Sequence, residues 1–100
     1  MAKTPEGKFK TQFIKDLRKV AKPLAVLQYK QDATTVAGFP DTIVILEGIT
    51  IYIEFKKSKT AGFRPGQKEW NKRLNENGHF AFICYPGNAD EVLEEIKRLV

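Results

Sequence analysis

The sequence predicts an α/β fold in which helices flank a mixed sheet, with the elements in the order αβββαβα. Two apolar, β-branched runs separated by two residues are typical of an antiparallel hairpin. A helical segment separates this hairpin from the next apolar run, so a right-handed crossover should place that strand parallel to the hairpin's second strand. Amphipathic segments near both ends of the chain provide further helices to cover the sheet.

The first helix is predicted to begin at Pro5, after Thr4 as its cap, and to end near Lys22. Apolar residues recur through it at helical spacing. The segment 24–29 is typical of a short strand. The polar, Gly-containing segment 30–39 then reads as a loop that leads to the hairpin.

The hairpin strands are the runs 43–46 and 49–53, joined by Glu47 and Gly48. A basic loop, 56–64, follows the second strand. Because a two-residue loop fixes the register of a hairpin, the residues that face each other across these strands can be derived from the sequence.

The helix after the basic loop is predicted over 65–77, ending at an Asn-Gly pair typical of a left-handed cap. Residues 80–85 form the next expected strand. Residues 86–88 then turn the chain into a last helix with Asn88 as its cap. Acidic residues in its first turn and basic residues in its last turn match the helix dipole.

The chain length of 100 residues fits a single domain, which we expect to span 1–100. With 42% hydrophobic and 11% aromatic residues, the chain is too apolar for disorder and too interrupted by charge for a membrane span. Its first residues contain no apolar stretch of signal-peptide length, so we expect a cytoplasmic protein. Cys84 lies among apolar residues, which predicts a buried and unreactive thiol.

The net charge of +5 is unevenly distributed. Residues 1–75 contain fifteen Lys or Arg and seven Asp or Glu, a balance of +8, whereas residues 76–100 contain two and five, a balance of −3. A solvated, lysine-rich face would explain this excess without any function. A polyanionic partner is favoured only if the basic residues surround a site that needs phosphates.

The hairpin register predicts a pair of facing carboxylates. If Glu47 and Gly48 form the loop, Leu46 faces Ile49 and, counting outward along both strands, Asp41 faces Glu54. Residues directly opposite each other have Cβ atoms about 4.5 to 5.5 Å apart, so the two carboxylates can converge on one cation. The next alternate residue, at position 56, is a lysine on the same face.

Facing carboxylates repel each other, and a bound divalent cation would remove the conflict. Hard oxygen ligands without a Cys or His cluster favour magnesium or manganese over zinc. Such an ion suits phosphodiester chemistry, with Lys56 orienting a water or stabilising charge on the phosphate. Considered singly, Asp41 could be a turn residue, and Glu54 and Lys56 ordinary exposed strand residues; their joint placement favours the metal site.

These residues resemble the signature of a known superfamily. The segment Gly38-Phe39-Pro40-Asp41, followed after a short hairpin by Glu54-Phe55-Lys56, is similar to the motif of PD-(D/E)XK nucleases, which have a restriction-endonuclease-like core. More narrowly, the chain resembles a stand-alone VRR-NUC domain of bacterial viruses. The helix start at Thr4-Pro5 and the segment Pro65-Gly66-Gln67 extend the resemblance to nearly the whole chain.

The resemblance implies metal-dependent hydrolysis of DNA, with Asp41, Glu54 and the backbone carbonyl of Phe55 as metal ligands and Lys56 as the catalytic lysine. Gln67 would belong to the same catalytic site. Glu6 would correspond to an acidic residue on the first helix that contributes through water or to a second metal. A favourable position in the first turn of a helix explains Glu6 equally without catalysis.

Similar viral domains are homodimers that act on branched DNA such as four-way (Holliday) junctions, which implies DNA as partner and, for a viral protein, action in the host cytoplasm. Phe63 and Trp70 are candidates for an interface or for stacking on DNA, although a core position explains Trp70 better. His79 is better explained as a structural residue than as a general base. Phosphate contacts are plausible for a basic cluster: Lys57, Lys59, Arg64, Lys68, Lys72 and Arg73.

Two other functions fit the same pattern less well. A catalytically inactive DNA-binding or architectural module of the same fold would not require the intact trio Asp41, Glu54 and Lys56. A protein-interaction domain with a basic surface would bind DNA with little dependence on salt, whereas a DNA-binding protein should lose affinity steeply as salt rises.

Overall fold

The computed structural model describes residues 5–20, 27–30, 38–46 and 48–99. Within these ranges no helix is long and apolar enough to cross a membrane. The elements follow the predicted order, with one short 3-10 helix added before the last α-helix. They are α1 (Pro5–Val20), β1 (Leu27–Lys30), β2 (Thr42–Leu46), β3 (Ile49–Phe55), α2 (Gln67–Glu76), β4 (Phe80–Cys84), η1 (Pro86–Asn88) and α3 (Ala89–Leu99).

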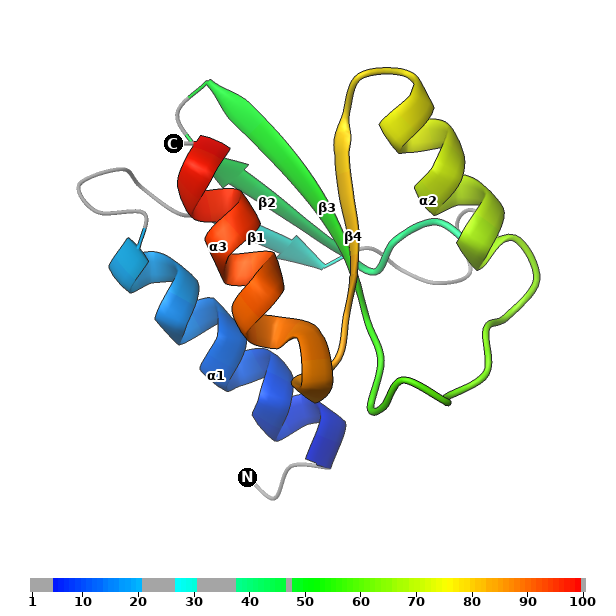
Figure 1. Cartoon of the computed structure of the whole chain (residues 1–100), viewed down its shortest axis with the longest axis horizontal. Coiled ribbons are helices and arrows are strands. Elements are labelled where there is room, and N and C mark those ends of the chain that lie inside the picture. Colours follow the sequence, from blue (N-terminus) through cyan, green and yellow to red (C-terminus); the bar gives the residue numbers. More distant parts are fainter. Residues whose placement is uncertain (1–4, 21–26, 31–37, 47, 100) are drawn as a thin grey trace.

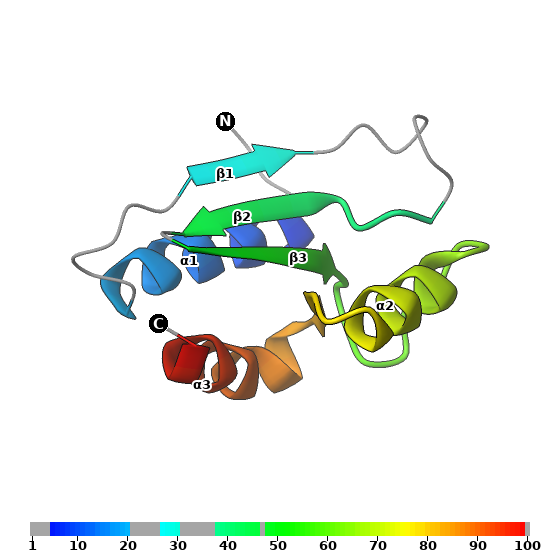
Figure 2. The ribbon, with the colours of Figure 1, turned by 90° about the horizontal axis from the view of Figure 1, so that it is seen from above.

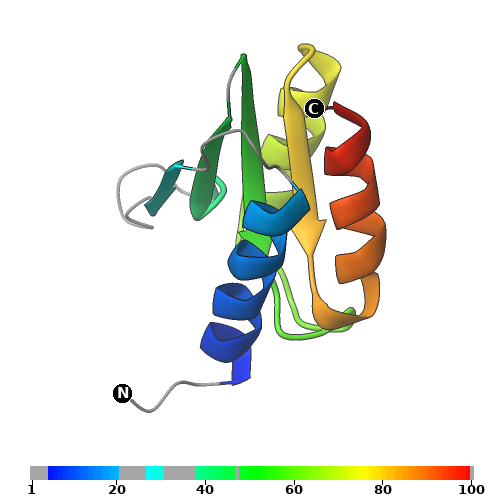
Figure 3. The same ribbon diagram turned by 90° about the vertical axis from the view of Figure 1, so that its left-hand side faces the viewer.

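The four strands form one mixed sheet in the order β1-β2-β3-β4. β1 pairs with β2 and β2 with β3 in antiparallel fashion, whereas β4 is parallel to β3, which confirms the predicted crossover. Helices α1 and α3 lie side by side (Figures 1 and 3), and α2 lies on the far side of β4 from them (Figure 1). Seen from above, both α2 and α3 lie beyond β3 on the side away from β1 (Figure 2).

The core forms where α1 and α3 cover one face of the sheet. Alternate residues of β3, Ile51, Ile53 and Phe55, are buried there, as the strand pattern predicts. Phe13 of α1 packs edge-to-face against Phe55, with ring centroids 5.5 Å apart. Cys84 is also fully buried, as predicted, and burial raises the pKa of its thiol to about 12.

The hairpin register agrees with the sequence prediction. Leu46 pairs with Ile49, and the ladder continues without a slip to Thr42 and Ile53. Glu47, one of the two predicted loop residues, lies outside the described residues. Because the register is the predicted one, the residue before Thr42 and the residue after Ile53 are the next to meet beyond the end of the ladder.

Some element boundaries differ from the prediction. Helix α2 begins at Gln67 rather than at residue 65, because Gly66 has a φ of 87°, a left-handed conformation that cannot belong to the helix. At its other end, Gly78 has a φ of 85°, as the predicted Asn-Gly cap requires. The predicted cap Thr4 and residues 24–26 of the predicted strand 24–29 lie outside the described residues, whereas β1 (Leu27–Lys30) contains the rest of that strand.

Asparagine side chains attach the elements around the edge strand β4. The amide of Asn75 in α2 donates to the carbonyl of Ala81 and accepts from its N–H, at 3.0 and 3.1 Å. Asn88 directly precedes α3, as predicted for its cap, but its side chain turns back to Tyr85 N and Ile83 O. The two bonds of Asn75 therefore attach α2 to β4, and those of Asn88 attach the turn before α3 to the end of the same strand.

The chain passes very close to itself at Gly38. Gly38 has a φ of 80°, and a Cβ atom there would lie 2.4 Å from the carbonyl carbon of Gly66. Only glycine permits such an approach. The contact places the segment that leads into β2 directly against the start of α2.

We predict that Gly38→Ala destabilises the protein far more than Gly78→Ala. Both positions have positive φ, so both substitutions introduce strain of about 1 to 2 kcal/mol. The space around Gly78 is open, whereas Gly38 meets backbone atoms, which should add roughly 1 to 3 kcal/mol. Urea denaturation measures both values. Equal losses for the two variants would show that the close approach at Gly38 does not constrain the fold.

Candidate functional site

A cavity of about 430 Å³ opens at the end of β3, between the start of β2, the basic loop and the start of α2. Four of the residues predicted to form the site, Asp41, Glu54, Lys56 and Gln67, line it together. Phe55, predicted to contribute its backbone carbonyl, lines it as well. The remaining lining residues are Lys57, Ala61, Gly62 and Arg64.

Asp41 and Glu54 meet at the open end of the hairpin, one step beyond the ladder. The backbone N–H of Asp41 donates to Glu54 Oε1 over 3.2 Å. The hydroxyl of Thr42, which is fully buried, donates to Asp41 Oδ1 over 2.9 Å. The register therefore brings the two carboxylates together.

Glu54 is an unusual carboxyl group, since only 5% of the residue is exposed. Burial, followed by the nearby charge of Asp41, raises its pKa to about 7, against the opposing effect of Lys56. Repulsion from Asp41, expected from the facing carboxylates, is thus the second cause of the raised pKa of Glu54, after burial.

The side-chain amide of Gln67 joins the acidic and basic halves of the site. Its Nε2 donates to Glu54 Oε2 over 2.8 Å, and its Oε1 accepts from Lys56 Nζ over 2.6 Å. The same oxygen accepts from the backbone N–H of Arg64 over 2.7 Å. An ammonium and a backbone N–H can only donate, so Lys56 and Arg64 identify Oε1 as the acceptor, and the Nε2 group therefore faces Glu54. Gln67 is only 3% exposed, which shields the bridge from water.

Lys56 is held by uncharged groups. Besides Gln67, its ammonium donates to the carbonyl of Gly62 over 3.0 Å and lies 4.8 Å from the ring centroid of Phe63. The basic loop thus folds back over the lysine at the end of β3. Its positive charge faces the cavity that Asp41 and Glu54 line.

Lys10 of α1 is a site residue that the sequence analysis missed. Its ammonium lies 3.5 Å from Asp41 Oδ2 and 5.3 Å from the ring centroid of Phe55. A signal for it exists, because Lys10 precedes the buried Ile14 and Leu17 by four and seven residues and so shares the inward face of the helix.

Other candidates lie away from the cavity or outside the described part. The side chain of Glu6 lies outside the described residues, so its proposed role stays a prediction. Trp70 packs edge-to-face on Phe39, with centroids 5.0 Å apart, on the sheet face opposite the main core. His79 is exposed and contacts the ring of Tyr52, a structural contact.

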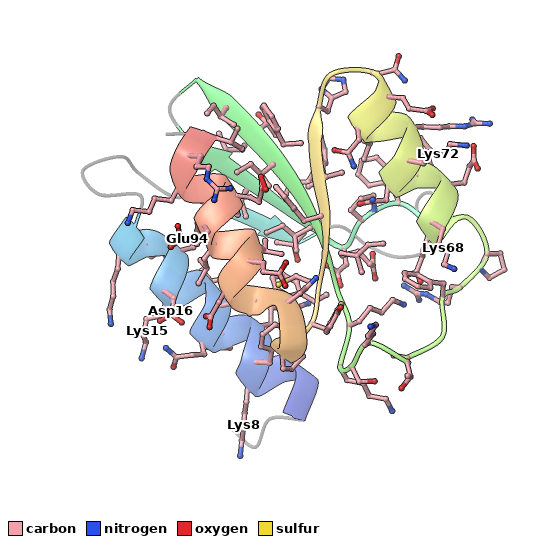
Figure 4. The ribbon with its side chains drawn as sticks, viewed as in Figure 1. Lys8, Lys15, Asp16, Lys68, Lys72 and Glu94 are labelled. Carbon is pink, nitrogen blue, oxygen red and sulfur yellow. The ribbon has the colours of Figure 1, made fainter. Side chains whose placement is uncertain are left out.

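The basic cluster is spread over the loop and α2. Lys57 and Arg64 line the cavity, whereas Lys68 and Lys72 project from α2 (Figure 4). Arg73 forms a salt bridge with Glu69 one turn away, over 2.8 Å. Only part of the cluster therefore reaches the site itself.

The site residues fit a hard divalent cation. Among the described residues no group of three or more His, Cys, Asp or Glu side chains gathers, so a metal would rely on two carboxylates and other oxygen donors. Mg²⁺ is commonly bound in this way, through one or two carboxylates with several retained waters. One positive group, the Lys10 ammonium, lies 3.5 Å from Asp41 Oδ2 in the structure.

We predict that Glu54→Gln stabilises the metal-free protein at alkaline pH. Folding raises the pKa of Glu54 from 4.5 to about 7, so the stabilising effect of its proton is complete below about pH 4.5 and is lost as pH rises through 7. Relative to wild type in chelator, the neutral variant should therefore gain up to about 3 kcal/mol between pH 5 and pH 8.

Urea denaturation at both pH values measures this difference, and Glu94→Gln on the exposed side of α3 is the control. The control should show no comparable change with pH. If Glu54→Gln changed the free energy of unfolding equally at pH 5 and pH 8, ionisation of Glu54 would not destabilise the fold, and the prediction would be refuted.

Two solved structures resemble this chain in fold. No family model and no curated protein matches the sequence. A solved structure named VRR_NUC domain is similar over 92% of this chain and 97% of its own, with a TM-score of 0.74 and 23% identity. A second, named VRR_NUC domain protein, is similar over 100% of this chain and 91% of its own, with a TM-score of 0.59 and 19% identity. This chain therefore has the fold of a VRR-NUC domain.

Proposed function

We propose that residues 1–100 form one nuclease domain, a divalent-metal-dependent endonuclease that hydrolyses phosphodiester bonds of DNA. The observation that carries this proposal is the bridge through Gln67, which links a buried carboxylate to a lysine at the rim of one cavity. The name of the structural neighbours, VRR_NUC domain, supports a nuclease.

The proposed metal ligands are Asp41, Glu54 and the backbone carbonyl of Phe55, and the proposed ion is Mg²⁺ or Mn²⁺. When bound, such an ion supplies a polarised phosphoryl oxygen and a water of lowered pKa. Thr42 and Gln67 each donate to one carboxylate oxygen and so orient the carboxylates. The ion would bind Asp41 Oδ2 and the second lone pair of Glu54 Oε1, which also accepts from the backbone N–H of Asp41.

Lys56 provides the positive charge for the reaction. Its ammonium stabilises charge that develops on the phosphate or orients the attacking water. Gln67 holds this ammonium at a fixed position relative to Glu54, so the charge need not be ordered when substrate binds. Gly62 and Phe63 restrain it from the side of the basic loop.

DNA is the proposed partner, and its phosphates would follow the positive charges from the cavity onto α2. Lys57 and Arg64 line the cavity, and Lys68 and Lys72 project from the helix that follows the basic loop (Figure 4). Binding through such contacts releases counterions, so affinity should fall steeply with added salt.

We further propose that the protein acts as a homodimer on branched DNA such as four-way junctions. The described chain contains one cavity with a paired carboxylate and lysine, and one such site cuts one strand. Symmetric cleavage of a junction therefore requires two subunits. Parallel assays of linear, flapped and four-way substrates separate this proposal from a nuclease without structural preference, which would cut all three equally.

We predict that Asp41→Asn and Glu54→Gln abolish DNA cleavage in Mg²⁺ or Mn²⁺ and that Lys56→Ala lowers kcat by at least about 100-fold. The matched controls Asp90→Asn and Lys97→Ala, on α3, should cleave like wild type. Cleavage of labelled DNA measures activity, and gel shift in chelator should show that binding survives in all five variants.

Full cleavage by the three site variants would refute the assignment of the site. If wild type bound DNA but cut none of the substrates, with or without divalent metal, the inactive DNA-binding module would be favoured instead.

A further inference from the structure

Lys10 is positioned like a bound cation at the proposed metal site. It reaches from α1 across the ring of Phe55 to Asp41 Oδ2, at 3.5 Å. The two side chains are only 20% and 17% exposed, so water screens their attraction less than at an open surface. Lys8, on the same helix, is exposed and points away from the site (Figure 4).

Each of the four carboxylate oxygens at the site has a partner in the structure. Thr42 donates to Asp41 Oδ1 and Gln67 to Glu54 Oε2, and both donors are buried and neutral. The backbone N–H of Asp41 donates to Glu54 Oε1. The remaining oxygen, Asp41 Oδ2, is the one that a cationic side chain contacts.

These partners differ in whether they tolerate a divalent cation. A neutral hydroxyl or amide that donates to a carboxylate oxygen helps to orient it and leaves that oxygen a second lone pair for an ion. An ammonium beside the oxygen that binds the ion would repel it. Of these four contacts, the one from Lys10 is therefore the contact that has to change when a divalent cation binds between Asp41 and Glu54.

We propose that Lys10 is an internal counter-ion that occupies Asp41 Oδ2 in the metal-free protein and is displaced when a divalent cation binds. This inference rests on the proposed metal site. Loading is then an exchange of one ammonium for one divalent ion. The ammonium lowers the repulsion between Asp41 and Glu54 while no metal is bound, and its presence weakens the affinity of the site for metal.

Calorimetric titration of the 100-residue chain with Mn²⁺ alone, without DNA, tests the exchange. Lys10→Met keeps the apolar stem over Phe55 but removes the charge, so Mn²⁺ should bind about three- to tenfold more tightly than to wild type. Lys10→Arg keeps the charge and should stay within about twofold of wild type. Lys8→Met removes one charge from the exposed side of the same helix and should also stay within about twofold.

Thermal unfolding in chelator provides a second readout. Without metal, Lys10→Met should have a lower Tm than Lys8→Met, because Asp41 and Glu54 have lost their counter-ion; saturating Mn²⁺ should remove this difference. A folded Lys10→Met variant that binds Mn²⁺ no more tightly than wild type would overturn the exchange and leave the proposed nuclease intact. A Lys10→Arg variant that binds as tightly as Lys10→Met would also overturn it, since charge would then not be the cause.

The metal site itself can fail separately. If neither wild type nor Lys10→Met binds Mn²⁺, the metal site of the proposed function is wrong, and this inference is wrong with it. If wild type and Lys10→Met both bind Mn²⁺ with the same affinity, only the exchange is wrong and the metal site stands.

Discussion

The site depends on one side-chain amide. Gln67 donates to Glu54 and accepts from Lys56, so it joins a carboxylate that the fold buries to an ammonium that the basic loop covers. Two glycines place this amide, because Gly66 ends the loop before α2 in a left-handed conformation and Gly38 lets the chain before β2 approach Gly66 closely. Helix, hairpin and loop thus meet at a single bridge.

The second constraint is electrostatic. The hairpin register brings Asp41 and Glu54 together in a sheltered place, which raises the pKa of Glu54 to about 7. In the metal-free protein the raised pKa lets Glu54 keep its proton to a higher pH, and the Lys10 ammonium lies beside Asp41. A divalent cation would replace both at once, which gives a physical reason why the arrangement suits metal-dependent hydrolysis better than a purely structural role.

Much of the fold follows from local pattern. The two-residue loop and the alternation along β3 predict the register, and the register places Asp41, Glu54 and Lys56 together. Contacts between distant elements were harder to predict. The bridge through Gln67 and the approach of Lys10 depend on how α2 and α1 pack on the sheet, which residue spacing does not determine. The role of Glu6 stays a prediction.

Anomalous diffraction from crystals of the protein soaked in Mn²⁺ would show whether the carboxylate pair binds a metal. We expect one peak within about 2.0 to 2.3 Å of a carboxylate oxygen of both Asp41 and Glu54, with the Lys10 ammonium moved away from Asp41 Oδ2. A peak bound to other residues, or none at saturating Mn²⁺, would contradict the claim that this carboxylate pair is a metal site.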